Sequence, residues 1–503
     1  FNFPLQSTTQ IAYDWRKSDY ERVTGTGTGY GVDPPFTLAT ANTKSSDQYI
    51  SHFVTFGYLI NQKFDYANLL GASFGFRSDY SSAFGEGSKP FTFPRADFYI
   101  RLSELIKSPA LYDLKLRAAY GEAGIQPSAY DRMITASSDI LGDQGYFYLP
   151  STSRNPALGV ERSKEIEFGL DYGISLMKGY WLNKASGSLV YWTRKSTGVI
   201  YTVDMPPSTG TAGIRDNAID LSSKGIQFSM DLDVYKSRNF DWKFGTRFTK
   251  GLTMVDKISN GNPIIIGEGG SGQTAIVEGE PVGAFFGTKP LSSLDQKDSN
   301  GDRYIDEADL NDYEVVNGMV VDKTSKQVQF TAEQEKIGDA TPKFSMSFFN
   351  DFTIHKNVLF SFQFDWVKGA EAYNVSRQWL YRDRIHPDFD KEITIGGQTG
   401  AWVAFYNSLY NTNNIHQYFV EDASFLRLRN ISLTYDLSDL IKNGFIKGLS
   451  VSVSAKNLLT VTNYSGMDPE AVGTNLNNPL YRGIDLWSFP NSKSVIFGVN
   501  VKF

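Results

Sequence analysis

Cysteine is absent from this sequence of 503 residues, which excludes a disulfide framework and any metal site built on thiolates. Histidine is nearly absent, and the four residues His52, His355, His386 and His416 are too scattered to have metal-ligand spacing. The net charge of −6 disfavours a nucleic-acid partner, which would need a basic face. No run of 18 apolar residues occurs, so the sequence predicts no membrane-spanning helix.

Two further features could suggest a phosphate-binding site or a catalytic site, but each has a simpler structural explanation. The glycine-rich stretch GEGGSGQ (267–273) is not followed by the Gly-Lys-Ser/Thr of a phosphate-binding loop, so we expect a flexible loop there. Asp231 and Asp233 lie two residues apart in an alternating segment, and we expect them to line a polar surface rather than to form an acid–base pair. The sequence therefore predicts a protein that is not an enzyme.

Aromatic residues, by contrast, make up 14% of the chain, although the mean hydropathy is only −0.31. A strict alternation explains this combination. Phe360, Phe362 and Phe364 alternate with Ser361 and Gln363, which places the rings on one face of a strand and the polar groups on the other. The same period of two recurs in residues 166–174, 226–234, 344–354 and 449–456, and in the last ten residues, SVIFGVNVKF.

The alternating segments predict strands that cross a membrane. They are about ten residues long, as needed to cross a bilayer at a tilt of about 45°, whereas strands of soluble proteins average about five or six. Lipid offers no partner to an open strand edge, so spanning strands must close on one another. We therefore predict an all-β fold, a transmembrane antiparallel β-barrel with apolar faces toward lipid and polar faces toward a pore. A last strand that ends on Phe503 fits this prediction, because its apolar residues meet hydrocarbon.

The chain is predicted to form one barrel-type domain over residues 1–503, with tight turns alternating with long loops. The tight turns are predicted at 235–240 and 354–358, on the periplasmic side. We count about fourteen strand candidates, which begin near residues 8, 49, 66, 95, 112, 164, 185, 225, 241, 343, 357, 424, 449 and 494. The long extracellular loops are predicted at 121–163, 252–342, 368–423 and 458–492. Residues 370–384 have helical spacing and are predicted to form a short helix above the membrane.

The loop 252–342 contains the sequence DSNGDRYIDEAD (298–309), which has the spacing of a calcium loop. Glycine stands at loop position four rather than six, and the last ligand is Asp rather than Glu, so the loop resembles a dockerin-type loop more than an EF-hand. Ile305 is expected to hold the loop by packing. We predict a structural calcium site, the alternative being a solvated acidic turn. The predicted ligands are Asp298, Asn300, Asp302, the carbonyl of Tyr304, Asp306 and Asp309.

Several phrases, taken in order, resemble the SusC/RagA family of TonB-dependent transporters of Bacteroidetes outer membranes. The phrases are LKLRAAYGEAG (114–124), EIEFGLDYGI (165–174), VEGEPVGAFFG (277–287), the 298–309 loop, GDATPKFSMSFFNDF (338–352), VEDASFLRLRNISLTYDL (420–437), SVSAKNLLTVTNYSGMDPE (452–470) and the final strand. The resemblance implies a 22-stranded barrel with an N-terminal plug, of which these fourteen strands are the C-terminal portion. It further implies a SusD-like surface lipoprotein as a lid, energy from the TonB complex, and import of oligosaccharides or peptides. The plug, the TonB box and the export signal are then expected in an N-terminal region outside this sequence.

Two alternatives to import stay open at this point. The chain could be a structural subunit of a larger outer-membrane complex, together with other outer-membrane proteins, or a passive porin of fourteen strands. The loop aromatics Trp379, Tyr381, Trp402 and Tyr406 could stack on ligands or simply pack, so the sequence names no substrate. Arg427 and Arg429 are expected to form salt bridges in the lumen wall.

Overall fold

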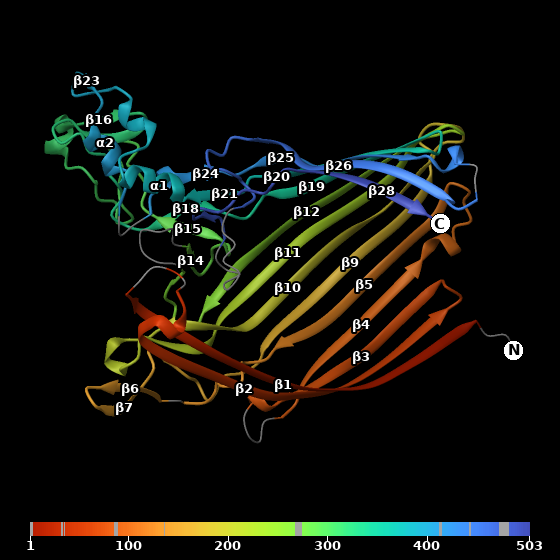
Figure 1. The fold of residues 1–503 in the computed structure, drawn as a ribbon, viewed down its shortest axis with the longest axis horizontal. Helices are drawn as coiled ribbons and strands as arrows, with labels where there is room; N and C mark the ends of the chain where they lie inside the picture. Colours follow the sequence, from red (N-terminus) through yellow and green to blue (C-terminus); the bar gives the residue numbers. More distant parts are fainter. Residues whose placement is uncertain are drawn as a thin grey trace. The chain divides into compact units, whose positions relative to one another are not determined.

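The computed structural model describes residues 4–31, 34, 36–84, 89–134, 136–266, 274–411, 415–441, 444–471 and 482–503 (Figure 1). The glycine-rich stretch 267–273 lies outside these residues. Two compact units divide the chain. The first comprises residues 1–101, 117–167 and 194–221, and the second comprises residues 102–116, 168–193 and 222–503.

One sheet contains 15 strands, of which fourteen are long. The remaining strand is the short β8 (Thr152–Ser153), which pairs with β11. The long strands are β1 (Leu5–Tyr30), β2 (Ala41–Tyr66), β3 (Leu70–Ser81), β4 (Phe91–Arg101), β5 (Leu111–Ile125), β9 (Glu161–Ser175), β10 (Lys184–Asp204), β11 (Gly213–Lys236), β12 (Phe240–Ile258), β19 (Phe344–Ile354), β20 (Val358–Lys368), β25 (Phe425–Asp436), β26 (Gly448–Thr462) and β28 (Ser494–Lys502). Twelve of them begin within four residues of the predicted position, whereas β2 and β11 begin 8 and 12 residues earlier. The prediction of about fourteen strands is confirmed.

Within the first unit, strands β1 to β4 pair antiparallel in chain order. β1 pairs with β2 along its whole length, from Leu5 opposite Tyr66 to Tyr30 opposite Ala41. β3 and β4 continue the pairing. Residues 71–75 in β3 spell Gly-Ala-Ser-Phe-Gly, which matches the Gly-x-Ser-x-Gly pattern of hydrolases. That pattern needs a strand-to-helix turn, but here the five residues run within one strand, so no nucleophile elbow forms.

Within the second unit, β12, β19, β20, β25, β26 and β28 pair antiparallel in that order. The turn between β19 and β20 is three residues long, with Ile354 opposite Val358. His355 and Lys356 adopt positive φ angles of 47° and 64° there, and the amide of Asn357 donates to the carbonyl of Ile354 at 3.2 Å, as in a type I′ turn. The predicted tight turn at 354–358 is therefore confirmed.

The two faces of these strands differ as the alternation predicts. The ring centroids of Phe360 and Phe362 lie 5.8 Å apart, and those of Phe362 and Phe364 are separated by the same distance, so the rings form a continuous aromatic surface. On the other face, the Ser361 hydroxyl lies 2.7 Å from that of Ser432, and Gln363 donates to Asp365 at 2.8 Å. The three Phe side chains are half-buried rather than enclosed in a protein core. This segregation fits strands whose aromatic face meets hydrocarbon.

Smaller elements fill the long connections. In the connection that follows β5, β6 (Ser137–Leu141) and β7 (Gln144–Tyr148) form a hairpin. The other strands are β13 (Ile264–Ile266), β14 (Thr274–Ile276), β15 (Ala284–Gly287), β16 (Tyr313–Val316), β17 (Met319–Asp322), β18 (Glu335–Asp339), β21 (Glu371–Asn374), β22 (Ile393–Ile395), β23 (Gln398–Gly400), β24 (Val420–Asp422) and β27 (Ile484–Asp485). The 3-10 helices are η1 (Leu38–Thr40), η2 (Ser82–Phe84), η3 (Leu102–Glu104), η4 (Pro207–Thr209), η5 (Glu307–Asp312), η6 (Pro387–Asp390), η7 (Gln417–Phe419) and η8 (Ser438–Leu440).

Two α-helices are described, α1 (Val375–Arg382) and α2 (Val403–Ser408). The prediction of a helix over 370–384 is right only for residues 375–382, which form α1. Glu371–Asn374 form strand β21 instead, because Tyr373 pairs with Val420 and with Ile484 from distant parts of the chain. Among the described residues, no helix is both long enough and apolar enough to cross a membrane.

Candidate functional site

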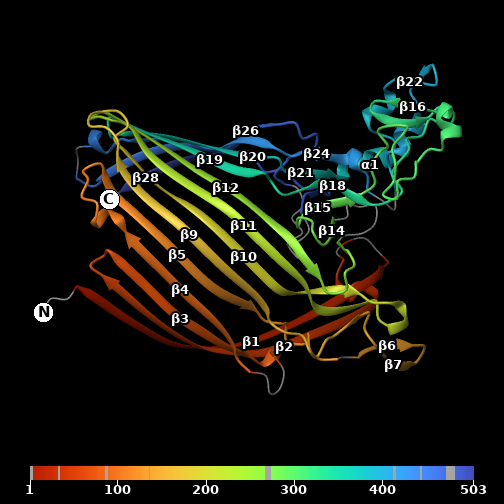
Figure 2. The same cartoon turned by 180° about the vertical axis from the view of Figure 1, so that it is seen from behind.

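Three long loops of the second unit pack into one body, which we call the loop module: the described parts of residues 259–343, 369–424 and 463–493. Their side chains meet in one hydrophobic core. Phe285 comes from the first loop, Tyr373, Tyr381 and Phe419 come from the second, and Ile484 comes from the third. All five are at most 1% exposed, and each large side chain buried in this way stabilises the fold by about 1.5–3 kcal/mol. The loop module therefore has a hydrophobic core of its own. It lies beyond the ends of β12, β19 and β20 (Figure 2).

The core explains three of the four loop aromatics considered above. Tyr381 and Tyr406 are buried in it. The indole N–H of Trp402 donates to the carbonyl of Ile393 at 3.0 Å, and the ammonium of Lys326 lies 4.9 Å from the centre of a Trp402 ring. These residues pack the module, whereas Trp379 lies at a surface cavity described below.

Charged side chains connect α1 to the rest of the module. Arg377 lies 3.3 Å from Glu421 and 3.7 Å from Asp388. Burial alone would raise the pKa of Asp388, but hydrogen bonds from Lys391, at 2.7 Å, and from Tyr381 outweigh it and hold the pKa below its usual range. Asp388 therefore stays ionised opposite Arg377.

A second group of charges, which we call the clasp, fixes the loop after β26 to strand β25. Arg427 is 2% exposed and donates to Asp468 at 2.5 Å and to Glu470 at 2.6 Å. Arg429 donates to Glu470 at 2.6 Å and to Asp365 at 2.7 Å. The expected salt bridges of Arg427 and Arg429 are therefore present, with loop carboxylates as the main partners.

The carboxylate of Asp468 also receives two backbone amides. Its oxygens accept hydrogen bonds from the amides of Glu470 and Asn491, both at 2.9 Å. Burial would raise the pKa of Asp468, but the bond from Arg427 and these two amides lower it overall. One ionised side chain thus holds Arg427 and both ends of the loop 463–493.

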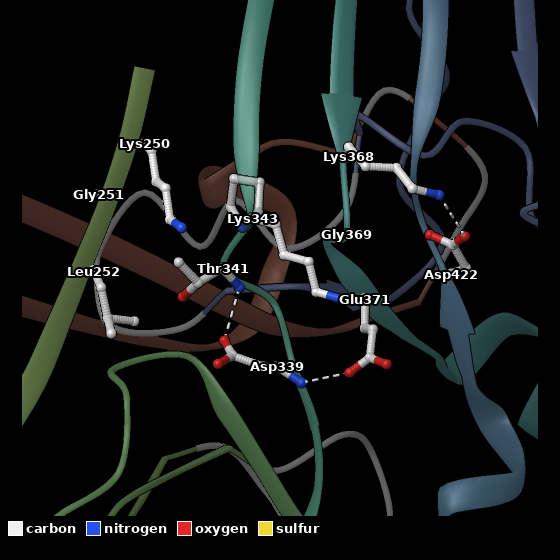
Figure 3. Close-up of a pocket in the computed structure, with 11 residues that line it drawn as sticks. Lys250, Gly251, Leu252, Asp339, Thr341, Lys343, Lys368, Gly369, Glu371 and Asp422 are labelled. Carbon is white, nitrogen blue, oxygen red and sulfur yellow. Dashed lines mark hydrogen bonds and ion pairs between the residues drawn. The ribbon is translucent and has the colours of Figure 1, made fainter. Parts of the chain in front are cut away.

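A cavity of about 480 Å³ lies where β12, β19 and β20 meet β18, β21 and β24 (Figure 3). Lys250, Lys343 and Lys368 line it together with three carboxylates, those of Asp339, Glu371 and Asp422. Glu371 accepts the backbone amide of Asp339 at 2.7 Å, and Lys343 points toward Glu371 in Figure 3. Positive and negative side chains balance, so the lining favours no ligand of one charge.

A second cavity of about 530 Å³, the α1 cavity, opens on the surface of the loop module. Trp379 and Leu380 of α1 line it, together with Met467, Trp487 and Phe489 of the loop 463–493. The rings of Trp379 and Trp487 lie 4.3 Å apart, edge to face. An apolar concave surface with a few polar groups is the usual form of a ligand pocket, which makes this cavity the second candidate site.

Comparison with known proteins relates these features to a class of receptors. No family model matches the chain. TonB-dependent receptor P3 of Formosa agariphila is 28% identical over 88% of this chain and 44% of its own length. TonB-dependent receptor SusC of Bacteroides thetaiotaomicron is 24% identical over 86% of this chain and 42% of its own length. The chain is similar to TonB-dependent receptors of the SusC type.

Solved structures support the same fold. A chain in the structure of the RagAB peptide importer in the closed-closed state matches all of this chain and 54% of its own length, with a TM-score of 0.77 and 18% identity. This likeness confirms the predicted β-barrel fold class. Together with the named relatives it bears out the SusC/RagA resemblance and the outer-membrane location. Those relatives are receptors rather than enzymes. The chain spans about half the length of the curated relatives that it matches.

The predicted calcium ligands lie along one loop, residues 298–309. Asp298 accepts the backbone amides of Asn300 and Asp302 through one oxygen, each at 2.9 Å, and the amide of Asp302 lowers the pKa of Asp298. Ile305 is buried against Leu291, as predicted. In the described part of the chain, no three His, Cys, Asp or Glu side chains form a metal-holding group. In the described residues the carboxylates of this loop do not converge, and the calcium site stays a prediction. Asp306 and Asp309 lie at the start of η5.

Sequence reasoning gave no cavity role to Trp487 or Phe489, which line the α1 cavity, and it assigned no role to the clasp carboxylates Asp468 and Glu470. The phrase NYSGMDPE contains both carboxylates, and the residues DLWSFP (485–490) carry two aromatics outside any alternating segment. The signal that could have indicated the cavity was this pair of aromatic residues in a loop that has no sustained alternation of apolar and polar residues.

Proposed function

We propose that this chain is the barrel portion of an outer-membrane importer of oligosaccharides or peptides. In the proposal, a SusD-like surface lipoprotein covers the long loops, and TonB supplies energy through regions outside this sequence. The observation that supports it most is the similarity to TonB-dependent receptors along 86–99% of the chain, on strands with one aromatic and one polar face.

The residues divide the work in this proposal. The polar faces of β19, β20 and β25, with Ser347, Ser361, Asp365 and Ser432, line a water-filled bore. The loop module lies on the extracellular side and offers the lid a surface that is folded before the lid arrives, which reduces the ordering cost of docking. The clasp keeps the loop 463–493 on the strands while the lid opens and closes.

Deletion of the complete gene in its native host tests import. Uptake of a labelled oligosaccharide mixture or a labelled peptide mixture should fall, and a plasmid copy should restore it only when TonB is present. A tagged copy should retain a surface lipoprotein on purification. Unchanged uptake of both mixtures would contradict import. Co-purification with assembly proteins would then favour the structural subunit, and a mature N-terminus at Phe1 would favour the passive porin.

We also propose that the loop 298–309 binds calcium as a structural ion. Asp298, Asn300, Asp302, the carbonyl of Tyr304, Asp306 and Asp309 would hold it, because a hard cation prefers six or seven oxygen ligands. The turn closed by the Asp298 carboxylate and the packing of Ile305 support this proposal. Binding would draw the carboxylates together and stiffen this part of the module.

A further inference from the structure

The α1 cavity is surrounded by large apolar side chains that are exposed, although side chains of this kind are usually buried in a folded protein. Phe489 is 94% exposed, Met467 is 81% exposed and Trp487 is 52% exposed, and Leu380 adds a further exposed apolar side chain. Clusters of exposed apolar side chains mark interaction sites. Their concave arrangement around about 530 Å³ suits the insertion of a group rather than flat contact.

The backbone that carries Trp487 is held in place. Trp487 has a φ of 52°, a left-handed conformation that is rare and strained for a bulky residue. Its amide donates to the Ser376 hydroxyl of α1 at 3.2 Å. Just before it, Asp485 pairs with Asn374 in the sheet and accepts a hydrogen bond from Tyr464 at 2.6 Å. A strained, exposed and fixed indole is expected of a preorganised binding residue.

The polar side chains that line the cavity are mostly engaged inside the module. Asn374 donates to Glu421 and to Ser465, both at 3.2 Å, and accepts from the amide of Arg377 at 2.8 Å. Ser465 donates to Glu421 at 2.8 Å, and Arg377 donates to the same carboxylate at 3.3 Å. A sugar needs several hydrogen-bonding partners for its hydroxyl groups, and leaving those groups desolvated is costly. An apolar side chain needs none.

We propose that the α1 cavity binds an aromatic or large aliphatic side chain of a peptide. The inference depends on the proposed import function, and it selects peptides from the two substrate classes named there. Trp487 and Trp379 form the wall against which the side chain packs, and Phe489 and Met467 border the opening.

The test uses the complete protein purified in detergent and calorimetric titration with three probes: N-acetyl-Ala-Ala-Phe-Ala-Ala-amide, the matched all-alanine peptide, and maltoheptaose. The Phe peptide should bind at least tenfold more tightly than the alanine peptide. Trp487→Ala should remove that difference. Trp181→Ala is the matched control, because Trp181 is similarly exposed, at 57%, and lines no part of the cavity. Phe489→Ala serves as a second variant if Trp487→Ala does not fold, since its ring is almost fully exposed.

Each outcome decides the proposal. Equal binding of the two peptides, or a Phe preference that survives in both variants, would overturn it. Maltoheptaose binding that is lost in Trp487→Ala would make the cavity a sugar site and also overturn it, while leaving import intact. Protection of Trp487 from hydrogen exchange by a co-purified lipoprotein, without peptide binding, would make the surface a protein interface. Because binding in detergent needs no TonB, uptake that stays unchanged when the gene is deleted, with peptide binding by the purified protein retained, would count against import alone.

Discussion

Replacing Arg427 with Met should release the loop 463–471 while the strands stay folded. Arg427 is almost fully buried, and it contacts Asp468 and Glu470 at 2.5 and 2.6 Å and Thr460 at 2.9 Å. Removing one partner of a buried ion pair costs about 3–5 kcal/mol, because the other charge is left without compensation. Glu470 keeps Arg429, so we expect the lower end, about 3 kcal/mol, in the free energy of local opening.

Hydrogen exchange followed by mass spectrometry on the complete protein measures this opening. The amides of Glu470 and Asn491 report on it directly, because both donate to Asp468. A loss of about 3 kcal/mol corresponds to exchange roughly 100-fold faster at these amides. Arg247→Met is the matched control. Arg247 makes two bonds to Asp231 at 2.8 and 2.9 Å, but both side chains are about half exposed, so the expected cost is below about 1 kcal/mol.

A double-mutant cycle with Asp468→Asn separates the ion pair from simple packing. If the clasp acts through charge, the two single changes should overlap, and the coupling energy should exceed about 1 kcal/mol. Exchange at Glu470 and Asn491 that changes no more in Arg427→Met than in Arg247→Met would refute the reasoning. So would a coupling energy near zero.

Three further predictions test other parts of the molecule. Burial lowers the pKa of His416 to about 4, below the value near 6.5 in the unfolded chain, so the unfolded chain takes up the proton first. The free energy of unfolding should therefore fall by up to roughly 3 kcal/mol between pH 6.5 and pH 4, seen as faster proteolysis of the loop module. The fall should be smaller in His416→Gln, where His386, whose pKa is also lowered by burial, still contributes. Val499→Arg should lower the free energy of unfolding of the barrel by about 2–4 kcal/mol, because it places a charge on the lipid face, whereas Asn500→Arg on the opposite face should not. Equal yields of the two variants as folded protein in outer membranes would contradict the assigned faces. Terbium luminescence sensitised by Tyr304 should appear on titration and be displaced by calcium, and it should be lost in Asp298→Asn but not in Asp295→Asn; no signal in the unchanged protein would rule out the calcium loop.

The strands could be predicted because their information is local. Each membrane strand repeats a choice between an apolar and a polar residue, and Phe360 to Phe364 show that choice without reference to the rest of the chain. The turn between Ile354 and Val358 is similarly short-range. β11 begins earlier than predicted because Gly213 and Ile214 pair with Thr152 and Ser153 of β8, and the alternation starts only later in the strand.

The loop module could not be predicted because its order arises from distant contacts. Phe285, Tyr373 and Ile484 share one core although 199 residues separate the first from the last (484 − 285). The same kind of contact converts Glu371–Asn374 from predicted helix to strand, since pairing with Val420 and Ile484 outweighs local helical spacing. Sequence alone also could not tell that Tyr381 is a core residue and Trp487 an exposed one, because both are aromatic residues in long loops with many polar neighbours.

The clasp and the α1 cavity are carried by the same loop, which makes a last prediction possible. Asp468 lines no part of the cavity, but it follows Met467 directly, and its carboxylate holds the amide of Asn491, two residues after Phe489. Releasing it should let both borders of the cavity move. Asp468→Asn should therefore weaken binding of the Phe peptide several-fold, whereas Asp231→Asn, which removes an exposed ion pair, should not. Titration of both variants checks this. Unchanged affinity in Asp468→Asn, together with faster exchange at Asn491, would mean that the cavity keeps its shape without the clasp, because the pairing of β27 with β21 suffices to fix Trp487.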